Sequence, residues 1–353
     1  MMSDGELVFI GCYTSEAGGR GDGITVTRRD PRTGELSAPR LVATTPSPSF
    51  LARHPRLPVL YAAGELAEGR VTAWAIAADG DLTLLGEQPT GGEHPCHLAV
   101  TADGRHLVTA NYGSGSVSVH PLDLLGVPGE RTDLRQHSGS GPVEDRQEGP
   151  HAHMATPDPD GDRVWVVDLG VDGLFPYRLD PDSGRLEPPP APFHVRPGTG
   201  PRHLARGDGR LYLVGELDGS ITGYDAATDG TLSERGRART SDADGPVQPS
   251  EIGLGADGRF GYVANRGPDT IAVFALQATS GIPALVGEVP SGGVWPRHFS
   301  IMPSIDPGGS EFLYVANERS DTVITFRIDP ETGIPAPGGP VLELGTPTCV
   351  LRA

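Results

Sequence analysis

Arginine, histidine and glutamate residues gather in short signatures of this chain that begin with proline. Pro201-Arg202-His203 is matched by Pro296-Arg297-His298, and His151-Ala152-His153 follows Pro150. A guanidinium binds a carboxylate or phosphate through two parallel hydrogen bonds, while histidine and glutamate exchange protons near neutral pH. These residue types, with Glu216 as a further acid–base candidate, predict proton-transfer chemistry on a small anionic substrate.

The charge balance limits the kinds of partner that the chain can bind. Its 353 residues hold 28 lysines and arginines against 46 acids, a formal charge of −18, and all 28 cations are arginine. The lack of lysine excludes Schiff-base chemistry. The acidic balance argues against nucleic acid and an anionic membrane surface, and no apolar run approaches the ~18 residues of a membrane span. Because the N-terminus lacks a signal-peptide pattern and the three cysteines are far apart, we expect a cytoplasmic protein without disulfides or zinc.

The proline signatures recur at a regular interval. Successive prolines are 47, 55, 51, 48, 47 and 51 residues apart. The seven prolines are Pro48, Pro95, Pro150, Pro201, Pro249, Pro296 and Pro347. Each signature opens a short strand, and a turn, an apolar strand, an alternating strand, a second turn and a short outer strand follow. This grammar predicts an all-β, seven-bladed β-propeller with four antiparallel strands per blade, in one domain over residues 1–353. Two β-sandwich domains are the alternative, which a period kept over seven units disfavours.

Both chain ends are needed for the seventh blade. The last signature supplies one strand, 347–352, and the missing strands are expected at residues 7–11, 24–27 and 34–36. A blade built from both termini leaves no open sheet edge.

The repeat also predicts where the candidate residues meet. Adjacent strands of a blade are antiparallel, so the start of the first strand lies beside the end of the second. The signatures and the second-strand ends of all blades are therefore expected at one mouth, which should be cationic and rich in histidine. The candidates are Glu65, His97, Asn111, His151, His153, Asp168, Arg202, His203, Glu216, Glu251, Asn265, Arg266, Arg297, His298, Asn317 and Glu318.

Structural roles compete with functional ones at these positions. A histidine or arginine at a strand start could hydrogen-bond the next blade, Asp168 could tie down its own loop, and the asparagines fit strand-end caps better than ligands. Residues 133–149 are polar and rich in glycine, and they form either a lid over the mouth or a solvated connection. Four histidines outside the signatures are expected at the surface or in loops: His54, His106, His120 and His194.

Several motifs together resemble a known family. They are Gly11-Cys12-Tyr13-Thr14, Ala110-Asn111-Tyr112, Arg146-Gln147 before Pro150-His151-Ala152-His153, Asp168-Leu169-Gly170, Gly200-Pro201-Arg202-His203, Gly215-Glu216-Leu217, Asn265-Arg266-Gly267 and Trp295-Pro296-Arg297-His298-Phe299. With these motifs the whole chain resembles the seven-bladed propeller lactonases. These are the cycloisomerase-type 6-phosphogluconolactonases and their relatives, the fungal carboxy-cis,cis-muconate lactonizing enzymes.

The resemblance implies hydrolysis of a sugar δ-lactone, 6-phosphogluconolactone by default, without a metal or other cofactor. The active residues proposed for the muconate branch match His151, Arg202, Glu216 and Arg266. His151, or alternatively Glu216, would activate water, and the two arginines would stabilise the oxyanion. Arg297 and His298 would hold the phosphate or carboxylate of the substrate. Further substrate-binding positions are His153, His203, Asn111, Asp168, Glu251, Asn265 and Asn317. No Gly-x-Ser-x-Gly elbow is present, so a serine nucleophile is not expected. The protein is expected to be a monomer or a weak homo-oligomer that binds a small anionic lactone.

Three other functions stay open. A muconate-type cycloisomerase would use the same mouth. A metal-dependent lactonase would use oxygen ligands of Glu65, Asn111, Asn265 and Glu318 for a hard divalent ion. A non-enzymatic binding scaffold is the third, because the propeller fold does not dictate function.

Overall fold

The protein is built almost entirely from β-strands. The computed structural model describes residues 5–159, 163–189, 191–207, 209–227, 229–276, 280–306 and 309–353. Within these ranges the helical structure is a single 3₁₀ turn, η1 (Ser15–Ala17). No helix in this part of the chain is long and apolar enough to cross a membrane.

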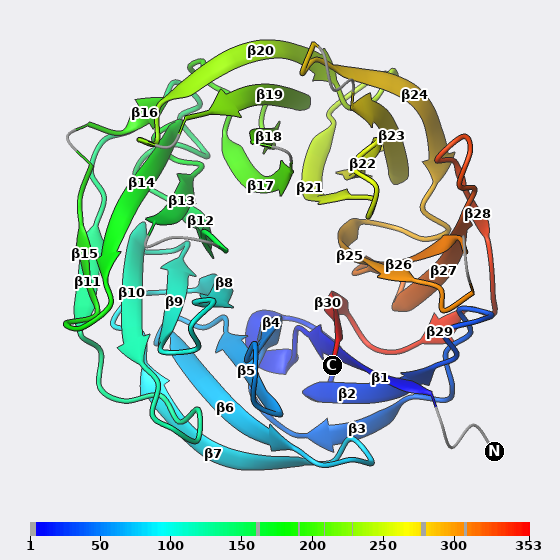
Figure 1. Ribbon diagram of the computed structural model, residues 1–353, viewed down its shortest axis with the longest axis horizontal. Coiled ribbons are helices and arrows are strands. Elements are labelled where there is room, and N and C mark those ends of the chain that lie inside the picture. The colour runs from blue at the N-terminus through cyan, green and yellow to red at the C-terminus, as the bar shows by residue number, and fades with distance from the viewer. Residues whose placement is uncertain are drawn as a thin grey trace. The chain divides into compact units, whose positions relative to one another are not determined.

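The described strands form seven antiparallel sheets, which are the blades of a seven-bladed β-propeller (Figure 1). The first blade along the chain comprises β4 (Pro48–Arg53), β5 (Val59–Gly64), β6 (Arg70–Ile76) and β7 (Leu82–Pro89). The second comprises β8 (Pro95–Val100), β9 (His106–Asn111), β10 (Ser116–Pro121) and β11 (Asp133–Gln136). The third comprises β12 (Ala152–Pro157), β13 (Arg163–Asp168), β14 (Gly173–Asp180), β15 (Arg185–Glu187) and β16 (Phe193–His194). The next three are β17 (Pro201–Gly207), β18 (Arg210–Gly215), β19 (Ser220–Ala226) and β20 (Leu232–Arg239); β21 (Gln248–Leu254), β22 (Phe260–Arg266), β23 (Thr270–Leu276) and β24 (Pro283–Pro290); and β25 (Pro296–Pro303), β26 (Glu311–Asn317), β27 (Thr322–Ile328), β28 (Pro335–Pro337) and β29 (Leu342–Glu343).

The seventh sheet joins the two ends of the chain. Its order is β3 (Arg40–Ala43), β2 (Ile24–Arg29), β1 (Glu6–Cys12) and β30 (Pro347–Arg352), so N-terminal and C-terminal strands lie side by side (Figure 1). The predicted closure by both termini is confirmed. The outer strand was expected at residues 34–36, and this is wrong. Gly34 instead closes a turn with Asp30, Leu36 forms only an isolated bridge to Arg29, and the strand follows at β3.

Each proline signature opens the first strand of a blade, as predicted. In the register, Pro95 lies opposite Asn111, Pro249 opposite Asn265, and Pro296 opposite Asn317. The start of the first strand thus adjoins the end of the second. The third blade is the exception, because its first strand begins at Ala152, two residues after the proline.

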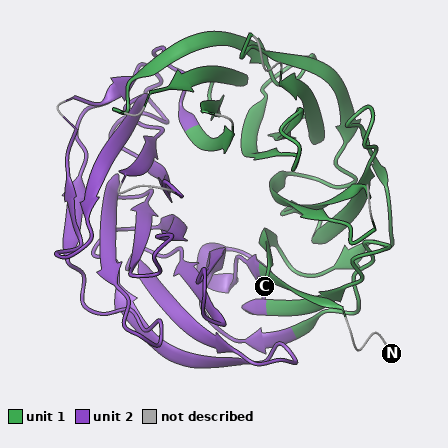
Figure 2. Cartoon of the chain, in the orientation of Figure 1, with its two compact units in different colours: residues 1–10, 25–40, 202–352 green, residues 11–24, 41–201, 353 purple. Residues whose placement is uncertain are grey.

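The chain divides into two compact units (Figure 2). The first unit comprises residues 1–10, 25–40 and 202–352, and the second comprises residues 11–24, 41–201 and 353. The division passes through the sheet of β1, β2 and β3. The single domain expected over residues 1–353 stays a prediction.

The core of each unit lies between neighbouring blades. In the second unit, Val108 and Val119 of one blade are buried against Ala155 and Val166 of the next. In the first unit, small and β-branched residues of β22 and β23 pack in the same way against Phe299. Packed sheet faces hold the signature strands rigidly, which is the condition for precise placement of their polar side chains.

Candidate active site

A β-bulge at the start of the first strand sets the direction of the signature side chains. The register of β25 shifts between Pro296 and His298, and that of β8 shifts between Pro95 and His97. An extra residue at this point bends the strand and re-aims its side chains. Because the bulge recurs in several blades, Arg297 and its counterparts are placed by the fold and not by the flexibility of a loop.

A carboxylate fixes the backbone just before three of the signatures. Asp269 Oδ1 accepts the N–H of Trp295 at 2.8 Å, and Asp321 Oδ1 accepts that of Thr346 at 2.7 Å. Asp172 holds Gly200 in the same way, at 2.8 Å. Trp295 and Thr346 have φ of 65° and 44°, left-handed values that cost energy for residues other than glycine. The aspartates stabilise this strained backbone conformation directly before the first strand.

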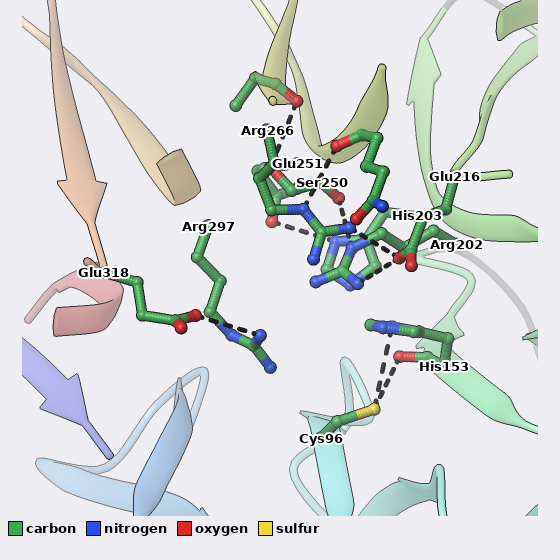
Figure 3. A network of polar contacts seen from close by, with 12 residues as sticks. Cys96, His153, Arg202, His203, Glu216, Ser250, Glu251, Arg266, Arg297 and Glu318 are labelled. Atoms are coloured by element: carbon green, nitrogen blue, oxygen red, sulfur yellow. Dashed lines mark hydrogen bonds and ion pairs between the residues drawn. The ribbon is translucent and has the colours of Figure 1, made fainter. Parts of the chain in front are cut away.

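Two arginines of the first unit converge on one glutamate oxygen. Arg202 Nη1 donates to Glu216 Oε2 at 2.6 Å, and Arg266 Nη2 lies 2.8 Å from the same oxygen (Figure 3). Arg202 comes from β17, Glu216 follows β18, and Arg266 ends β22. All three side chains are at most 5% exposed. We call these residues the arginine–glutamate cluster.

Backbone contacts hold the two guanidinium groups in position. Arg202 Nε donates to the carbonyl of Ser250 at 3.0 Å, and Arg266 Nε donates to that of Gln248 at 3.2 Å. The Arg266 guanidinium also lies over the ring of Trp295, 5.3 Å from its centroid. The expected bond from a signature arginine to the next blade is therefore present. It leaves Nη1 of Arg202 directed at Glu216.

Burial shapes the electrostatics of this cluster. The pKa of Arg266 is lowered to about 10, mainly because burial disfavours its charged form, and the charges of Arg202 and Arg297 add to this while Glu216 opposes it. Arg266 remains cationic at neutral pH. With Glu216 ionised, the cluster carries two positive charges and one negative charge, an excess that suits a developing oxyanion.

A histidine–glutamate belt, His203, Glu251 and His298, joins three neighbouring blades of the first unit. Glu251 Oε2 lies 3.0 Å from His203 Nδ1 and 3.4 Å from His298 Nε2. His298 Nδ1 accepts the N–H of Val350 at 3.3 Å, so the ring proton is on Nε2 and faces Glu251. Burial raises the pKa of Glu251, lowers that of His298 to about 4, and lowers that of His203 well below its usual range. Both histidines are neutral donors near pH 7.

The remaining predicted residues of the first unit have protein partners. Arg297 Nη1 donates to Glu318 Oε2 at 3.3 Å (Figure 3). Asn265 and Asn317 donate to the carbonyls of Thr240 and Ser291, at 2.7 and 3.2 Å, and so act as strand-end caps.

The cationic mouth expected from the sequence stays a prediction, and the arginines of the first unit lie beside glutamates. Arg202 and Arg266 share Glu216, Arg297 pairs with Glu318, and Glu251 lies against His203 and His298. Buried guanidinium groups need counter-charges, and the glutamates that look like separate candidates in the sequence supply them.

His151, in the second unit, has an oriented ring. Its Nδ1 lies 3.0 Å from the carbonyl of Tyr112, and the two rings stack 4.5 Å apart. A carbonyl only accepts, so Nδ1 carries a proton. Nε2 lies 3.2 Å from Glu148 Oε1, whose side chain is 64% exposed. The two contacts fix the orientation of the ring, with Nε2 facing an exposed carboxylate.

Asp168 is fully buried and anchors the backbone of His151. Its Oδ1 accepts the N–H groups of His151, Gly170 and Val171 at 2.7, 3.0 and 3.3 Å. Its Oδ2 lies 2.6 Å from Nδ1 of His137. The open alternative that Asp168 ties down its own loop is therefore observed, and its predicted contact with substrate stays a prediction.

Sequence reasoning missed His137 as a functional candidate. The available signal was the longest interval between signatures, 55 residues, in which this histidine lies. The segment that follows is tied down by Gln147, which is fully buried, accepts the N–H of Val143 at 3.2 Å and donates to the carbonyl of Leu169 at 2.8 Å. These bonds favour an anchored connection over a lid.

The other predicted residues of the second unit belong to blade contacts. The thiol of Cys96 donates to the carbonyl of His153 at 3.3 Å (Figure 3), and the His153 ring meets Tyr112 edge-on. Asn111 donates to Ser116 at 3.1 Å. His97 Nδ1 accepts the N–H of Ala155 in the next blade, at 3.5 Å.

Three of the four histidines expected at the surface or in loops are buried, although His54 does lie in a loop. His54, His106 and His120 are at most 4% exposed, whereas His194 is exposed as expected. His54 and His120 lie 3.1 and 3.2 Å from the carbonyls of Gly104 and Pro89, in neighbouring blades. The sequence predicts the strands but not the side chains that join one blade to the next.

The two carboxylates of the metal-dependent alternative have protein partners, whereas Oδ1 of Asn111 and Oδ1 of Asn265 are buried without a hydrogen bond from the residues that the structure describes. Glu65 Oε1 accepts the hydroxyl of Tyr13 at 2.8 Å, and Glu318 pairs with Arg297. Within the described ranges, no group of three or more histidine, cysteine, aspartate or glutamate residues has the arrangement of a metal site.

Comparison with known proteins places the chain in one family. The model of the seven-bladed β-propeller lactonases matches residues 7–352. The 6-phosphogluconolactonase of Bacillus subtilis is 36% identical over 332 residues, 92% of each chain. That of Formosa agariphila is 31% identical over 338 residues, 92% of this chain and 93% of its relative. The structure of the periplasmic gluconolactonase of Pseudomonas aeruginosa superposes with a TM-score of 0.90, 31% identity and 98% coverage of both chains.

Proposed function

This chain belongs to the family of seven-bladed β-propeller lactonases, and we propose that it hydrolyses a sugar δ-lactone, 6-phosphogluconolactone first, without a metal ion. The lactonase activity follows from relatives of that name over most of the chain. The observation that carries the mechanism is the arginine–glutamate cluster, in which two buried guanidinium groups share one carboxylate oxygen.

The proposed reaction is an addition of water followed by ring opening. Water attacks the carbonyl carbon and gives one proton to His151 Nε2. The carbonyl oxygen becomes an oxyanion, which Arg202 and Arg266 stabilise. The bond from this carbon to the ring oxygen then breaks, and the ring oxygen leaves as a hydroxyl with a proton from the imidazolium. The product is an open-chain hydroxy acid, which ionises to its carboxylate.

His151 is the preferred base over Glu216 for an electrostatic reason. Proton uptake by Glu216 would cost both of its ion pairs, at 2.6 and 2.8 Å. Nδ1 of His151 is bound to the Tyr112 carbonyl, so Nε2 is the ring nitrogen that would take up the proton. Glu216 is then the counter-ion that holds the two arginines in place and limits their repulsion.

The test measures hydrolysis of 6-phosphogluconolactone and of unphosphorylated gluconolactone, with and without a chelator. Arg202→Ala should lower kcat about 10²–10³-fold, the usual cost of removing one oxyanion donor. His151→Gln should lower kcat about 10²–10⁴-fold, the usual share of a general base. A near-normal rate in either variant contradicts the role given to that residue.

Controls separate these roles from general damage to the protein. Arg70→Ala and His194→Gln change an arginine and a histidine that are exposed, and both should leave kcat unchanged. Loss of activity in chelator, restored by Ca²⁺ or Mg²⁺, would overturn metal independence. The double variant Arg202→Ala/His151→Gln should lose less than the product of the single losses, because groups that act in one step are not additive.

A further inference from the structure

The third blade departs from the pattern of the others at three places. Its first strand starts at Ala152, where other blades have proline, and its second strand ends in Asp168, where Asn111, Asn265 and Asn317 stand in the corresponding registers. The interval that leads into this blade, from Pro95 to Pro150, is also the longest, at 55 residues. In a repeat protein, departures gathered in one copy mark a place where that copy does something the others do not.

The second departure puts a carboxylate where three other blades have an amide. Both oxygens of Asp168 are used, three bonds going to backbone N–H groups and the fourth to His137 Nδ1 at 2.6 Å. The side chains of Asp168 and His137 are 0% and 1% exposed. A carboxylate buried so completely needs every acceptor site filled, and His137 fills the site that the backbone leaves open.

His137 occupies a position that has a simpler occupant in other blades. Its N–H donates to Gly115 at 3.0 Å, just as Thr90, Thr240 and Ser291 donate to the turn of their own blades at 2.8–2.9 Å. Those residues end in a short hydroxyl side chain. We call this bond, from the residue after the outer strand to the turn of the same blade, the latch. At the latch of His137, an imidazole extends into the next blade and reaches Asp168.

The surroundings of His137 leave its ring one orientation. Nδ1 faces Asp168, and Nε2 lies 3.0 Å from the hydroxyl of Tyr177. Phe175 stacks on the ring at 3.9 Å, and the ring planes of His137 and Tyr177 are nearly parallel, 8° apart. A ring held at both nitrogens and on one face can act as a rigid strut.

We propose that His137, Asp168 and Tyr177 form a buried positioning unit that fixes the backbone of His151 and, through it, the direction of its Nε2. This inference rests on the proposed role of His151 as the base. The link is the bond of 2.7 Å from the His151 N–H to Asp168, combined with the Nδ1 contact to Tyr112. None of the three residues touches substrate in this proposal.

The test compares His137→Leu with His137→Asn and Tyr177→Phe. His137→Leu removes the donor to Asp168 and should lower kcat about 10²-fold with little change in KM, because a catalytic group displaced by about 1 Å loses that much. His137→Asn keeps an N–H close to the position of Nδ1 and should recover activity to within about tenfold of the wild type. Tyr177→Phe removes only a hydroxyl, and kcat should fall several-fold.

A second readout does not depend on turnover. The titration midpoint of the His151 ring, followed by NMR, should shift in His137→Leu and stay near the wild-type value in His137→Asn. Glu148 and, across Tyr112, His153 also face this ring and are unchanged in all variants. The matched control is Thr90→Val, which alters the same latch in a blade without such a histidine and should change neither kcat nor the titration.

The outcomes separate this inference from the proposed function. If wild-type protein hydrolyses neither lactone, the proposed function fails, and the NMR titration alone decides the positioning unit. If His151→Gln is inactive but folded His137→Leu keeps wild-type kcat, pH profile and His151 titration, the inference is overturned while the function stands. If His137→Leu does not fold, Tyr177→Phe decides, and wild-type values in that variant overturn the inference.

Discussion

The arginine–glutamate cluster predicts that Glu216→Gln destabilises the protein strongly. The substitution keeps the size of the side chain and removes the charge that compensates Arg202 and Arg266, at 2.6 and 2.8 Å. Two unit charges 4 Å apart attract by about 4 kcal/mol at an effective dielectric constant of 20. Removing one partner of a buried pair costs about 3–5 kcal/mol, because the remaining charge stays buried without compensation. We expect a loss of that size in the free energy of unfolding.

The assay is urea unfolding of Glu216→Gln beside a matched exposed pair. Arg70 and Glu87 also lie 2.7 Å apart, but their side chains are 46% and 50% exposed. Glu87→Gln should therefore cost about 0.2–1 kcal/mol. The difference between the two losses reports the effect of burial together with that of the second guanidinium, since the distances are nearly the same.

Anions provide the second half of this test. Glu216→Gln leaves two buried guanidinium groups without their carboxylate, so added phosphate should stabilise the variant more than the wild type. An anion at 100 times its Kd stabilises the folded state by about 2.7 kcal/mol. A loss below about 1 kcal/mol together with equal stabilisation of both proteins by phosphate would refute the reasoning, because Glu216 would then not be the counter-ion of the pair.

Two further predictions concern pH and the segment around Gln147. Burial lowers the pKa of His298 from 6.5 to about 4 in the folded protein, so the unfolded chain takes up this proton first as the pH falls. Stability from this group is full above pH ~6.5 and declines towards pH ~4 by up to about 1.4 kcal/mol per pH unit, and urea midpoints at pH 7.5, 6 and 5 should show a shallower slope in His298→Gln. Gln147→Ala breaks the bonds to Val143 and Leu169, so limited proteolysis should cleave residues 137–149 faster than in the wild type. Glu144→Ala changes an exposed position of the same segment and should be cleaved at the wild-type rate.

The fold was predictable because local signals agree with one another in every blade. Each signature proline opens a first strand or, in the third blade, precedes it by two residues, and the next strand ends where antiparallel pairing requires. The outer strand of the seventh blade is predicted too early in the sequence. Gly34 closes a turn, and the strand β3 begins only at Arg40. A turn signal fixes the reversal of the chain but not how many residues follow before pairing resumes.

The site was predictable in its membership and not in its pairings. Position in the repeat is enough to gather Arg202, Glu216 and Arg266, because the backbone determines where each strand begins and ends. Which oxygen a guanidinium meets depends on the rotamers of long side chains and on burial, and neither is written in the spacing of the signatures. For that reason glutamates counted as separate candidates proved to be counter-ions.

The third blade shows where reading a repeat by its regularity fails. Asp168 fits the pattern by position and is predicted to contact substrate, while His137 lies outside every signature and has no predicted role. The two side chains meet at 2.6 Å because an outer-strand latch of one blade adjoins the second-strand end of the next. That adjacency recurs around the repeat, so it could have been inferred once the latch position was known. His137 is unusual for a latch position, and Asp168 is unusual for the end of a second strand. Because the two positions are adjacent, the two departures together indicate a functional contact that neither indicates alone.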